Sequence, residues 1–550
     1  MTEITIEKTG NFWIDNGIVG LYKILREADY NVELDATTFS VSSENNNGKN
    51  VEEILNHAKE AVVKHYLIQT KNFGWILKEE RFEIYRKTDF KMHLKPFFEG
   101  KTGKPEEGAV CTPNSKKSDL GAKGRYMTSN EYENFLKFKE EGSSILIEDK
   151  KIKLTNKGYL NAPPKYDIGK YFSNDYFKDG DKLCNFSGKY YKKVDKINGI
   201  NYPFLTSMTG EINFASQMKL KPNISSLYSF ISLFSFYNLN FLVQLNEKGK
   251  IKDAHYFVLY DNSLKDLEYF QNTIIKDIDN FTKSDFCSFE TQITGTQYES
   301  ESFFNFLLSV YAQVKQRIDR DKRRGILLKK SVFTLSKDGN IFRDVKEYTS
   351  LNSLFELFDC FDDNGTDERS YREPFLNFVR YFNKRLDSGK YDTTWRNRLC
   401  SDILSFRSIL NTVEWFMAEV KIKEDKGGII FLDKIIEIYN LKTQKKMKQE
   451  MVKICQSIGI NIGIYAEKEN DKSSLYLLRN SKSRTEFLKV LELIQFRILN
   501  SEKIPLEFKT KNYEDFFLML DKDWEEYKSL VSIFSMNSFL IEKKKESEKQ

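Results

Sequence analysis

The sequence predicts an α+β fold, with a mixed α/β N-terminal region at residues 1–344 and a C-terminal helical bundle at residues 345–550. Short runs at residues 32–41 alternate between apolar and polar, as half-buried strands do. Past residue 345, apolar residues recur at spacings of three and four, which is typical of packed helices. A loop insertion around residues 100–190 interrupts the first region, because the apolar pattern lapses from Gly100 onward.

Composition limits the class of protein. The 550 residues allow two to four domains at roughly 150 residues each. Hydrophobic residues make up 40% of the chain and charged residues 30%, which excludes a disordered chain. The net charge is only +6, so any attraction to nucleic acid has to come from local basic patches.

The expected location is the cytoplasm, because the six cysteines are scattered and the chain opens on a charged segment without an apolar leader. The uncharged run at residues 222–246 is long enough to span a bilayer, but its serines and asparagines would be costly in lipid. We therefore expect a buried element there and no contact with a membrane.

The first well-defined stretch is residues 9–17, Thr-Gly-Asn-Phe-Trp-Ile-Asp-Asn-Gly, where turn-forming residues bracket the aromatic pair Phe12 and Trp13. Asp15 or Asn16 is expected to cap a helix whose apolar face includes Ile18. The following pattern predicts strands at residues 32–41, a helix at 51–67, a strand at 256–260, and helices at 264–281 and 303–324.

Basic and amide side chains of the loop insertion are candidates for reaching a DNA phosphate backbone or a base edge. A solvated loop without a ligand is an equal alternative. The candidates are Asn114, Lys116, Lys117, Lys123 and Arg125.

Two segments of the same insertion each resemble half of a zinc knuckle. In Cys111-Thr-Pro-Asn114 and Cys184-Asn-Phe-Ser187 the second ligand position of a C-x-x-C motif holds Asn or Ser. Two thiolates cannot form the closed four-ligand site of structural zinc. We therefore expect no metal and no cofactor, and describe the insertion as a degenerate, metal-free zinc-ribbon-like element.

Further basic candidates lie on predicted helices. Arg317, Arg320 and Arg324 form a stripe that either follows a phosphate backbone or pairs with the neighbouring aspartates. Arg396 and Arg398 are expected at outer, solvent-facing positions of the C-terminal bundle.

Catalytic patterns are few: the sequence has no G-x-S-x-G and no adjacent His-Asp pair, so serine-hydrolase and metal-dependent phosphohydrolase activities have no supporting motif. One alternative is a metal-dependent DNA nuclease that uses Asp402 with the E-x-K triplet Glu419 and Lys421. Such triplets are frequent by chance in a chain rich in Glu and Lys, and this one continues a helical pattern. A protein–protein scaffold without nucleic-acid binding is a second alternative.

The stretch Thr9 to Leu21 resembles the N-terminal signature T-G-N-x-[FW]-x-D-x-G of the Cst-type large subunit of the type I-B CRISPR surveillance complex, Cascade. The chain is also similar to that family in its length and in its order of parts: an α/β N-terminal part, a middle part with zinc-knuckle-like segments, and a helical C-terminal third. Asn114 and Ser187 depart from the paired cysteines that the family's knuckles carry.

The resemblance implies a non-catalytic subunit that recognises the protospacer-adjacent motif in double-stranded DNA, stabilises the R-loop and helps recruit a helicase-nuclease in trans. Implied partners are the crRNA-containing Cascade backbone subunits, a small subunit and target DNA. The C-terminal bundle would resemble the small subunit. In RNA-guided systems of this kind, base pairing reads the target sequence.

Overall fold

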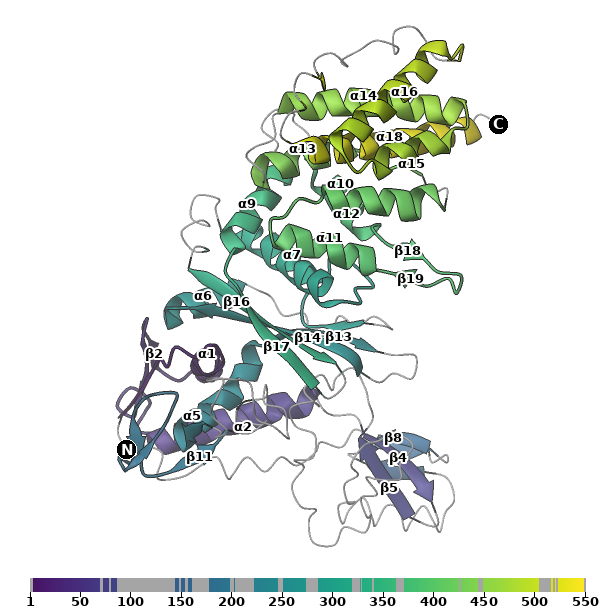
Figure 1. Ribbon diagram of the computed structural model, residues 1–550. Helices are drawn as coiled ribbons and strands as arrows, with labels where there is room; N and C mark the ends of the chain where they lie inside the picture. Colours follow the sequence, from purple (N-terminus) through teal and green to yellow (C-terminus); the bar gives the residue numbers. More distant parts are fainter. Residues whose placement is uncertain are drawn as a thin grey trace. The chain divides into compact units, whose positions relative to one another are not determined.

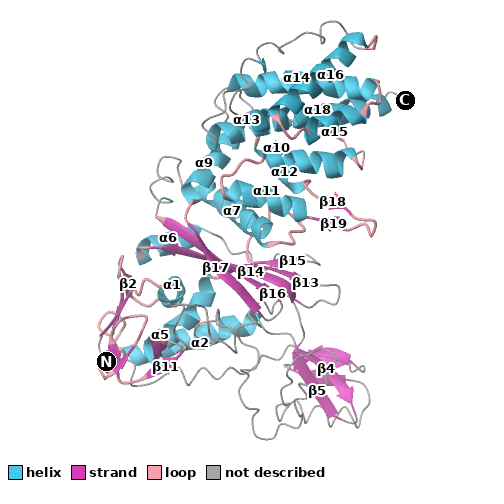
Figure 2. Cartoon of the chain, viewed as in Figure 1, coloured by secondary structure: helices cyan, strands magenta, loops and turns pink. Residues whose placement is uncertain are grey.

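The computed structural model of the chain (Figure 1) describes residues 3–69, 73–78, 81–86, 144–147, 150–153, 157–160, 178–197, 202, 222–245, 251–273, 285–318, 327, 329–338, 341–362, 370–424, 427–443, 449–503, 516–517, 520 and 523–548. These residues combine helices with small sheets, which confirms the predicted α+β class (Figure 2).

The chain folds as two compact units. The first contains Met1–Glu290 and Ala312–Leu351, and the second contains Thr291–Tyr311 and Asn352–Gln550. The predicted division at residue 344 lies inside strand β17 (Ile341–Tyr348), and the second unit includes a segment from before that point.

The first unit begins with helix α1 (Phe12–Glu27), which starts earlier than the sequence suggested. The side chain of Asn11 caps it by accepting hydrogen bonds from the backbone N–H groups of Trp13 and Ile14. Asp15 and Asn16 lie inside the helix, so the prediction that one of them is the cap was wrong. Asp15 instead accepts hydrogen bonds from Thr9 and from the Gly10 N–H, which fixes the preceding turn.

Helix α1 packs closely on the uncharged run, which forms helix α5 (Ser226–Ile231) and the 3₁₀ helix η3 (Ser232–Asn238). A Cβ atom at Gly17 would clash with the backbone carbonyl oxygen of Ile231, and one at Gly20 with that of Phe234. Most serines and asparagines of the run are buried, and several of them are hydrogen-bonded. The prediction of a buried element at this run is thus confirmed for the described residues. Within the described part of the chain, every helix is too short or too polar to cross a bilayer.

A five-stranded antiparallel sheet in the order β15-β13-β14-β16-β17 forms the centre of the first unit. Helix α1 is attached to it by a hydrogen bond of 2.7 Å from Asn16 Nδ2 to the carbonyl of Leu259. Phe12 stacks on Phe333 at 4.1 Å between ring centroids. The other sheet strands and helices are β13 (Asn240–Leu245), β14 (Ile251–Asp261), α6 (Leu264–Thr273), β15 (Asp285–Cys287) and β16 (Lys330–Asp338).

Smaller sheets complete the first unit, and all their strand pairs are antiparallel. The predicted strands at 32–41 and helix at 51–67 are present. The elements are β1 (Glu3–Glu7), β2 (Val32–Leu34), β3 (Thr38–Ser42), α2 (Val51–Gln69), β4 (Phe73–Lys78), β5 (Arg81–Arg86), β6 (Ser144–Ile147), β7 (Lys150–Lys153), β8 (Lys157–Leu160), β9 (Lys182–Leu183), β10 (Tyr190–Tyr191), β11 (Val194–Lys196) and β12 (Asn223–Ser225).

Helices dominate the described residues of the second unit. They are α7 (Glu299–Arg317), whose last part belongs to the first unit, α9 (Leu351–Asp362), α10 (Arg372–Arg380), α11 (Thr394–Leu404), α12 (Leu410–Phe416), the π-helix η4 (Met417–Ile422), α13 (Leu432–Thr443), α14 (Gln449–Lys468), α15 (Lys472–Asn480), α16 (Arg484–Asn500) and α18 (Trp524–Ser547). One short hairpin, β18 (Lys384–Arg385) with β19 (Tyr391–Asp392), lies among them.

Several apolar residues of the three-and-four spacing past residue 345 are buried, among them Leu399, Ile403 and Val413, whereas Phe517 is 37% exposed. These three buried residues do not lie on one continuous helix, because the backbone turns left-handed at Phe406 (φ 51°) between α11 and α12. Helices α14 and α18 pack closely where Gly459 and Gly463 face the backbone of α18.

Candidate functional site

All five basic and amide candidates predicted from the loop insertion lie outside the described residues. This applies to Asn114, Lys116, Lys117, Lys123 and Arg125, and also to Cys111.

The segment that follows Cys184 is a tight hairpin turn between β9 and β10. Gly188 N–H donates to the Cys184 carbonyl at 3.0 Å, and the backbone of Gly188 is left-handed (φ 68°). The buried Cys184 sulfur accepts a hydrogen bond of 3.3 Å from Ser225 N–H. The sulfur thus has a protein partner in the neighbouring strand β12.

Of the predicted stripe on the helix at 303–324, the structure describes Arg317 alone. Helix α7 ends at Arg317, and Arg320 and Arg324 lie outside the described residues. The Arg317 side chain is exposed, and its Nη1 donates to the carbonyl of Asn272 at 3.0 Å. Arg317 thus lies at the surface, where its guanidinium is hydrogen-bonded to the backbone of the neighbouring helix α6.

Arg396 does not occupy the outer position that the sequence predicted. Its side chain is 3% exposed and forms an ion pair through Nε with Glu301 Oε2. Its Nη2 donates to the carbonyl of Gly295 at 2.6 Å, and its Nη1 donates to that of Arg380 at 3.2 Å. The predicted outer position of Arg396 was therefore wrong, because its guanidinium lies in the core and is paired with a carboxylate and two carbonyls.

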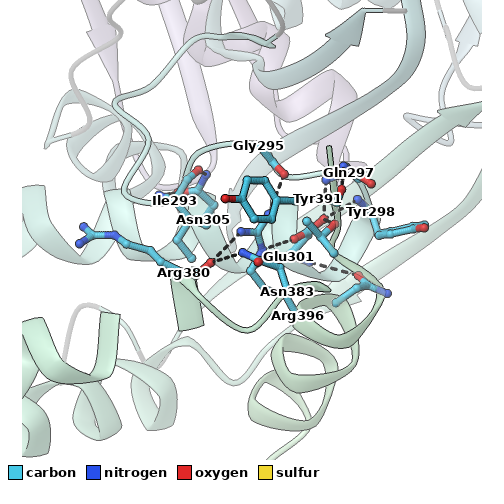
Figure 3. Close-up of polar contacts among 12 residues, drawn as sticks. Ile293, Gly295, Gln297, Tyr298, Glu301, Asn305, Arg380, Asn383, Tyr391 and Arg396 are labelled. Carbon is cyan, nitrogen blue, oxygen red and sulfur yellow. Dashed lines mark hydrogen bonds and ion pairs between the residues drawn. The ribbon is translucent and has the colours of Figure 1, made fainter. Parts of the chain in front are cut away.

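Glu301 completes this buried network (Figure 3). Its Oε1 accepts hydrogen bonds from Thr393 Oγ1 at 2.6 Å and from the backbone N–H groups of Gln297 and Tyr298. Both charges are therefore paired and hydrogen-bonded, the condition under which a buried ion pair is tolerated. Burial also raises the pKa of the neighbouring Cys400 thiol, which keeps that sulfur protonated.

The network holds both ends of the β18–β19 hairpin. The chain enters the hairpin after Arg380, whose carbonyl accepts from Arg396 and, at 2.9 Å, from Asn383 Nδ2. The chain leaves the hairpin at Thr393, whose hydroxyl donates a hydrogen bond to Glu301. Gln297 Nε2 donates a further hydrogen bond of 2.8 Å to the carbonyl of Tyr391. A buried ion pair thus positions an exposed hairpin.

The hairpin presents aromatic and cationic side chains to solvent. On the hairpin, Tyr391 is 51% exposed, and Arg385 and Lys390 are also exposed; Tyr381, the C-cap residue of α10 just before the hairpin, is 68% exposed. The turn of the hairpin is closed by a 2.8 Å hydrogen bond from Leu386 N–H to the Lys390 carbonyl, with Gly389 left-handed (φ 77°). This hairpin was not predicted, although Asp387-Ser388-Gly389 between two short runs is a recognisable turn signal.

Arg398 follows on α11 and is exposed as predicted. Its guanidinium lies 5.3 Å from the centroid of the Trp395 ring, a cation–π contact that leaves the side chain at the surface.

The residues of the alternative nuclease site are engaged elsewhere. Glu419 lies on the π-helix η4 rather than on a strand, and it pairs with Lys423 and with Arg479. The hydrogen bond from Lys423 lowers the pKa of Glu419. Asp402 accepts a hydrogen bond of 2.6 Å from Thr412 Oγ1, and Lys421 donates to the Gly427 carbonyl at 3.2 Å. Each of the three side chains thus has a protein partner.

An apolar pocket of about 530 Å³ lies beside the start of the hairpin. Phenylalanine and isoleucine side chains dominate its lining, with Lys421 and Glu373 as the charged members. The lining residues are Glu373, Pro374, Asn377, Phe378, Tyr381, Phe382, Phe416, Lys421, Gly428, Ile429, Ile430 and Phe431. Glu373 is already paired with Arg380 at 2.6 Å.

Across the described ranges, His, Cys, Asp and Glu side chains do not gather in threes as a metal site requires. No protein-family model matches the sequence, and no curated protein does so.

Proposed function

We propose that this chain is the non-catalytic large subunit of a type I-B CRISPR RNA-guided surveillance complex. In this role it recognises the protospacer-adjacent motif in double-stranded DNA, stabilises the R-loop and helps recruit a helicase-nuclease. The observation that carries the proposal is the stretch Thr9 to Leu21, which resembles the signature of the family's large subunits.

The positions of that signature have clear physical tasks in this chain. Asn11 caps α1, Asp15 fixes the turn before it, and Gly17 permits close packing on α5. The α+β class and the helical second unit also agree with the proposal.

The finer architecture belongs to the same proposal. The insertion around residues 100–190 would be a metal-free, zinc-ribbon-like element, and the helices of residues 345–550 would form a bundle resembling the small subunit. The proposed partners are the crRNA-containing backbone subunits, a small subunit, the target duplex and the helicase-nuclease, in the cytoplasm.

A nuclease role is less well supported because Asp402 and Glu419 each have a protein partner. A scaffold without nucleic-acid binding has no specific observation in its favour. The two alternatives are therefore treated as outcomes of the test.

The test is co-purification of the tagged full chain from its native host, followed by sequencing of bound RNA. We expect repeat-derived small RNAs and several protein partners, and selection of a few-base motif from a randomised duplex flank. A bare chain without RNA would contradict the proposal. Metal-dependent cleavage that is lost in Glu419→Ala would favour the nuclease, and DNA affinity that does not fall steeply with salt would favour the scaffold.

A further inference from the structure

The segment at residues 381–392, which runs from the end of α10 through the β18–β19 hairpin, combines the two features of a single-strand binding surface. Exposed Tyr381 and Tyr391 offer ring faces, and bases of any sequence stack on such faces. Arg385 and Lys390 offer cations for the phosphates between those bases. A ligand that stacks on these rings removes their apolar faces from water, which favours the bound state.

The charge balance of the hairpin favours a polyanion. It carries Lys384, Arg385 and Lys390 against two carboxylates. One of these, Asp392, accepts hydrogen bonds from the Thr394 N–H and Oγ1 at the base of the hairpin. Arg398 adds a further exposed cation on the following helix.

Hydrogen bonds and an ion pair hold the foot of the hairpin, which reduces the entropic cost of ordering it on binding. The Glu301–Arg396 ion pair, its hydrogen bond to Thr393 and the bond from Gln297 to the Tyr391 carbonyl are buried or at the foot of the hairpin. Figure 3 shows Tyr391 among the residues drawn around this network. These three contacts use the Tyr391 carbonyl and the side chains of Gln297, Glu301, Thr393 and Arg396, so they do not depend on the side chains of Tyr381, Tyr391 or Arg385.

We infer that the β18–β19 hairpin and the adjoining Tyr381 bind single-stranded nucleic acid, with Tyr381 and Tyr391 stacking on bases and Arg385 and Lys390 contacting phosphates. The inference deepens the proposed function and rests on it for the source of the strand, which would be the strand displaced when the target duplex opens. Single-strand binding by the hairpin itself follows from the surface alone.

The experiment measures the affinity of the purified full chain for a fluorescent oligothymidylate of about 20 nucleotides, longer than the ~4–16 nucleotides of common single-strand sites. Three double variants are compared with the unchanged chain. Tyr381→Ala with Tyr391→Ala removes the rings, Tyr381→Phe with Tyr391→Phe keeps them, and Arg385→Gln with Lys390→Gln removes the cations. Tyr269→Ala with Phe496→Ala is the control, because these two rings are also exposed.

We expect the alanine pair to weaken single-strand binding about tenfold or more, since each stacked base contributes substantially. The phenylalanine pair and the control should bind as the unchanged chain does. The cation variant should weaken binding and reduce the slope of log affinity against log salt by about 0.7 per lost phosphate contact. All variants should keep the thermal unfolding midpoint.

Unchanged single-strand affinity in a folded alanine pair would overturn the inference. So would loss of a co-purified protein, rather than of DNA affinity, in the same variant. The proposed function is tested separately by the RNA that co-purifies. RNA-bearing complexes with unchanged single-strand affinity refute the hairpin assignment alone, and hairpin-dependent binding by a chain without RNA refutes the proposed function alone.

Discussion

Arg396 illustrates how a single buried charge constrains its surroundings. The low-polarity interior would not accept a guanidinium unless Glu301 and the carbonyls of Gly295 and Arg380 replaced its lost water. Sequence spacing placed this residue on a helix, but it could not reveal that the helix face turns toward Glu301, 95 positions earlier in the chain.

The first prediction concerns this ion pair. Arg396→Met should lower the free energy of unfolding of the second unit by about 3–5 kcal/mol, because it leaves the Glu301 carboxylate buried without its partner. Chemical denaturation of the full chain measures the change. The double variant Arg396→Met with Glu301→Gln should cost less than the sum of the single changes. Additive effects would show that the two residues do not interact.

The second prediction concerns Glu414, which is 3% exposed between α12 and α18. Its Oε2 accepts a hydrogen bond of 2.9 Å from Ser529 Oγ, and its Oε1 lies 3.9 Å from Lys528 Nζ. Burial raises the pKa of Glu414 above its usual 4.5, despite opposing effects of Lys528 and Ser529. The folded chain therefore binds this proton more tightly than the unfolded chain does.

The sign of the effect follows from that difference. Wild-type stability should fall, relative to Glu414→Gln, as pH rises from below 4.5 through the raised pKa, because the wild type must then bury a charge. Denaturation of both proteins at a series of pH values measures the difference. A difference that stays constant with pH, or a wild type that gains stability relative to Glu414→Gln as pH rises, would contradict the assignment.

At the scale of elements, the contact between α1 and the α5–η3 segment depends on glycine. Alanine usually favours a helix over glycine, but the Ile231 and Phe234 carbonyl oxygens occupy the space that a Cβ would need. The close approach lets the buried polar groups of both segments reach each other, as in the bond from Asn238 Nδ2 to the Asn16 carbonyl at 3.1 Å.

The third prediction follows from this contact. Gly20→Ala should destabilise the first unit by about 1–3 kcal/mol, the usual cost of overpacking, despite the better helix propensity of alanine. Thermal unfolding monitored by circular dichroism measures the loss. Gly427→Ala is the matched control, because a Cβ there meets only an ordinary contact at 3.6 Å and should change little. Equal effects at the two sites would refute the packing argument.

Elements with strong local patterns were predictable, and elements fixed by distant partners were not. The strands at 32–41 and the helix at 51–67 could be predicted because their apolar residues recur with the period of a strand or a helix. The start of α1 was misplaced because both Asn11 and Asp15 are acceptable caps, and only the turn at Thr9 and Gly10 selects between them. The β18–β19 hairpin is too short to produce an alternating pattern.

At the scale of the whole molecule, the proposed binding of DNA depends on local charge. A net charge of +6 over 550 residues gives little general attraction, so affinity has to come from a few local contacts. Of the residues predicted from the sequence to contact DNA, Arg317 and Arg398 lie at the surface and Arg396 lies in the core.

The fourth prediction concerns these local contacts. Reversing Arg317 and Arg320 to Glu should weaken duplex binding by the assembled complex and reduce its salt slope by about 0.9 for each phosphate contact that is lost. Binding titrations at several salt concentrations measure the slope. The matched control reverses Lys544 and Lys545, an exposed pair at the end of α18, and should change neither value. Unchanged binding in the Arg317 and Arg320 variant would remove this stripe from the interface, and reversal of Lys116 and Lys117 tests the insertion in the same way.

The sequence by itself determined the α+β class, most of the strong helices and strands, the internal character of residues 222–246 and the resemblance at Thr9 to Leu21. These depend on composition, on local periodicity or on adjacent residues. Only the tertiary structure decided that Arg396 is a core residue, that Asn11 caps α1 and that an exposed hairpin is fixed by Glu301. The physical reason is that burial and ion pairing depend on which distant segments meet, and no local pattern records that.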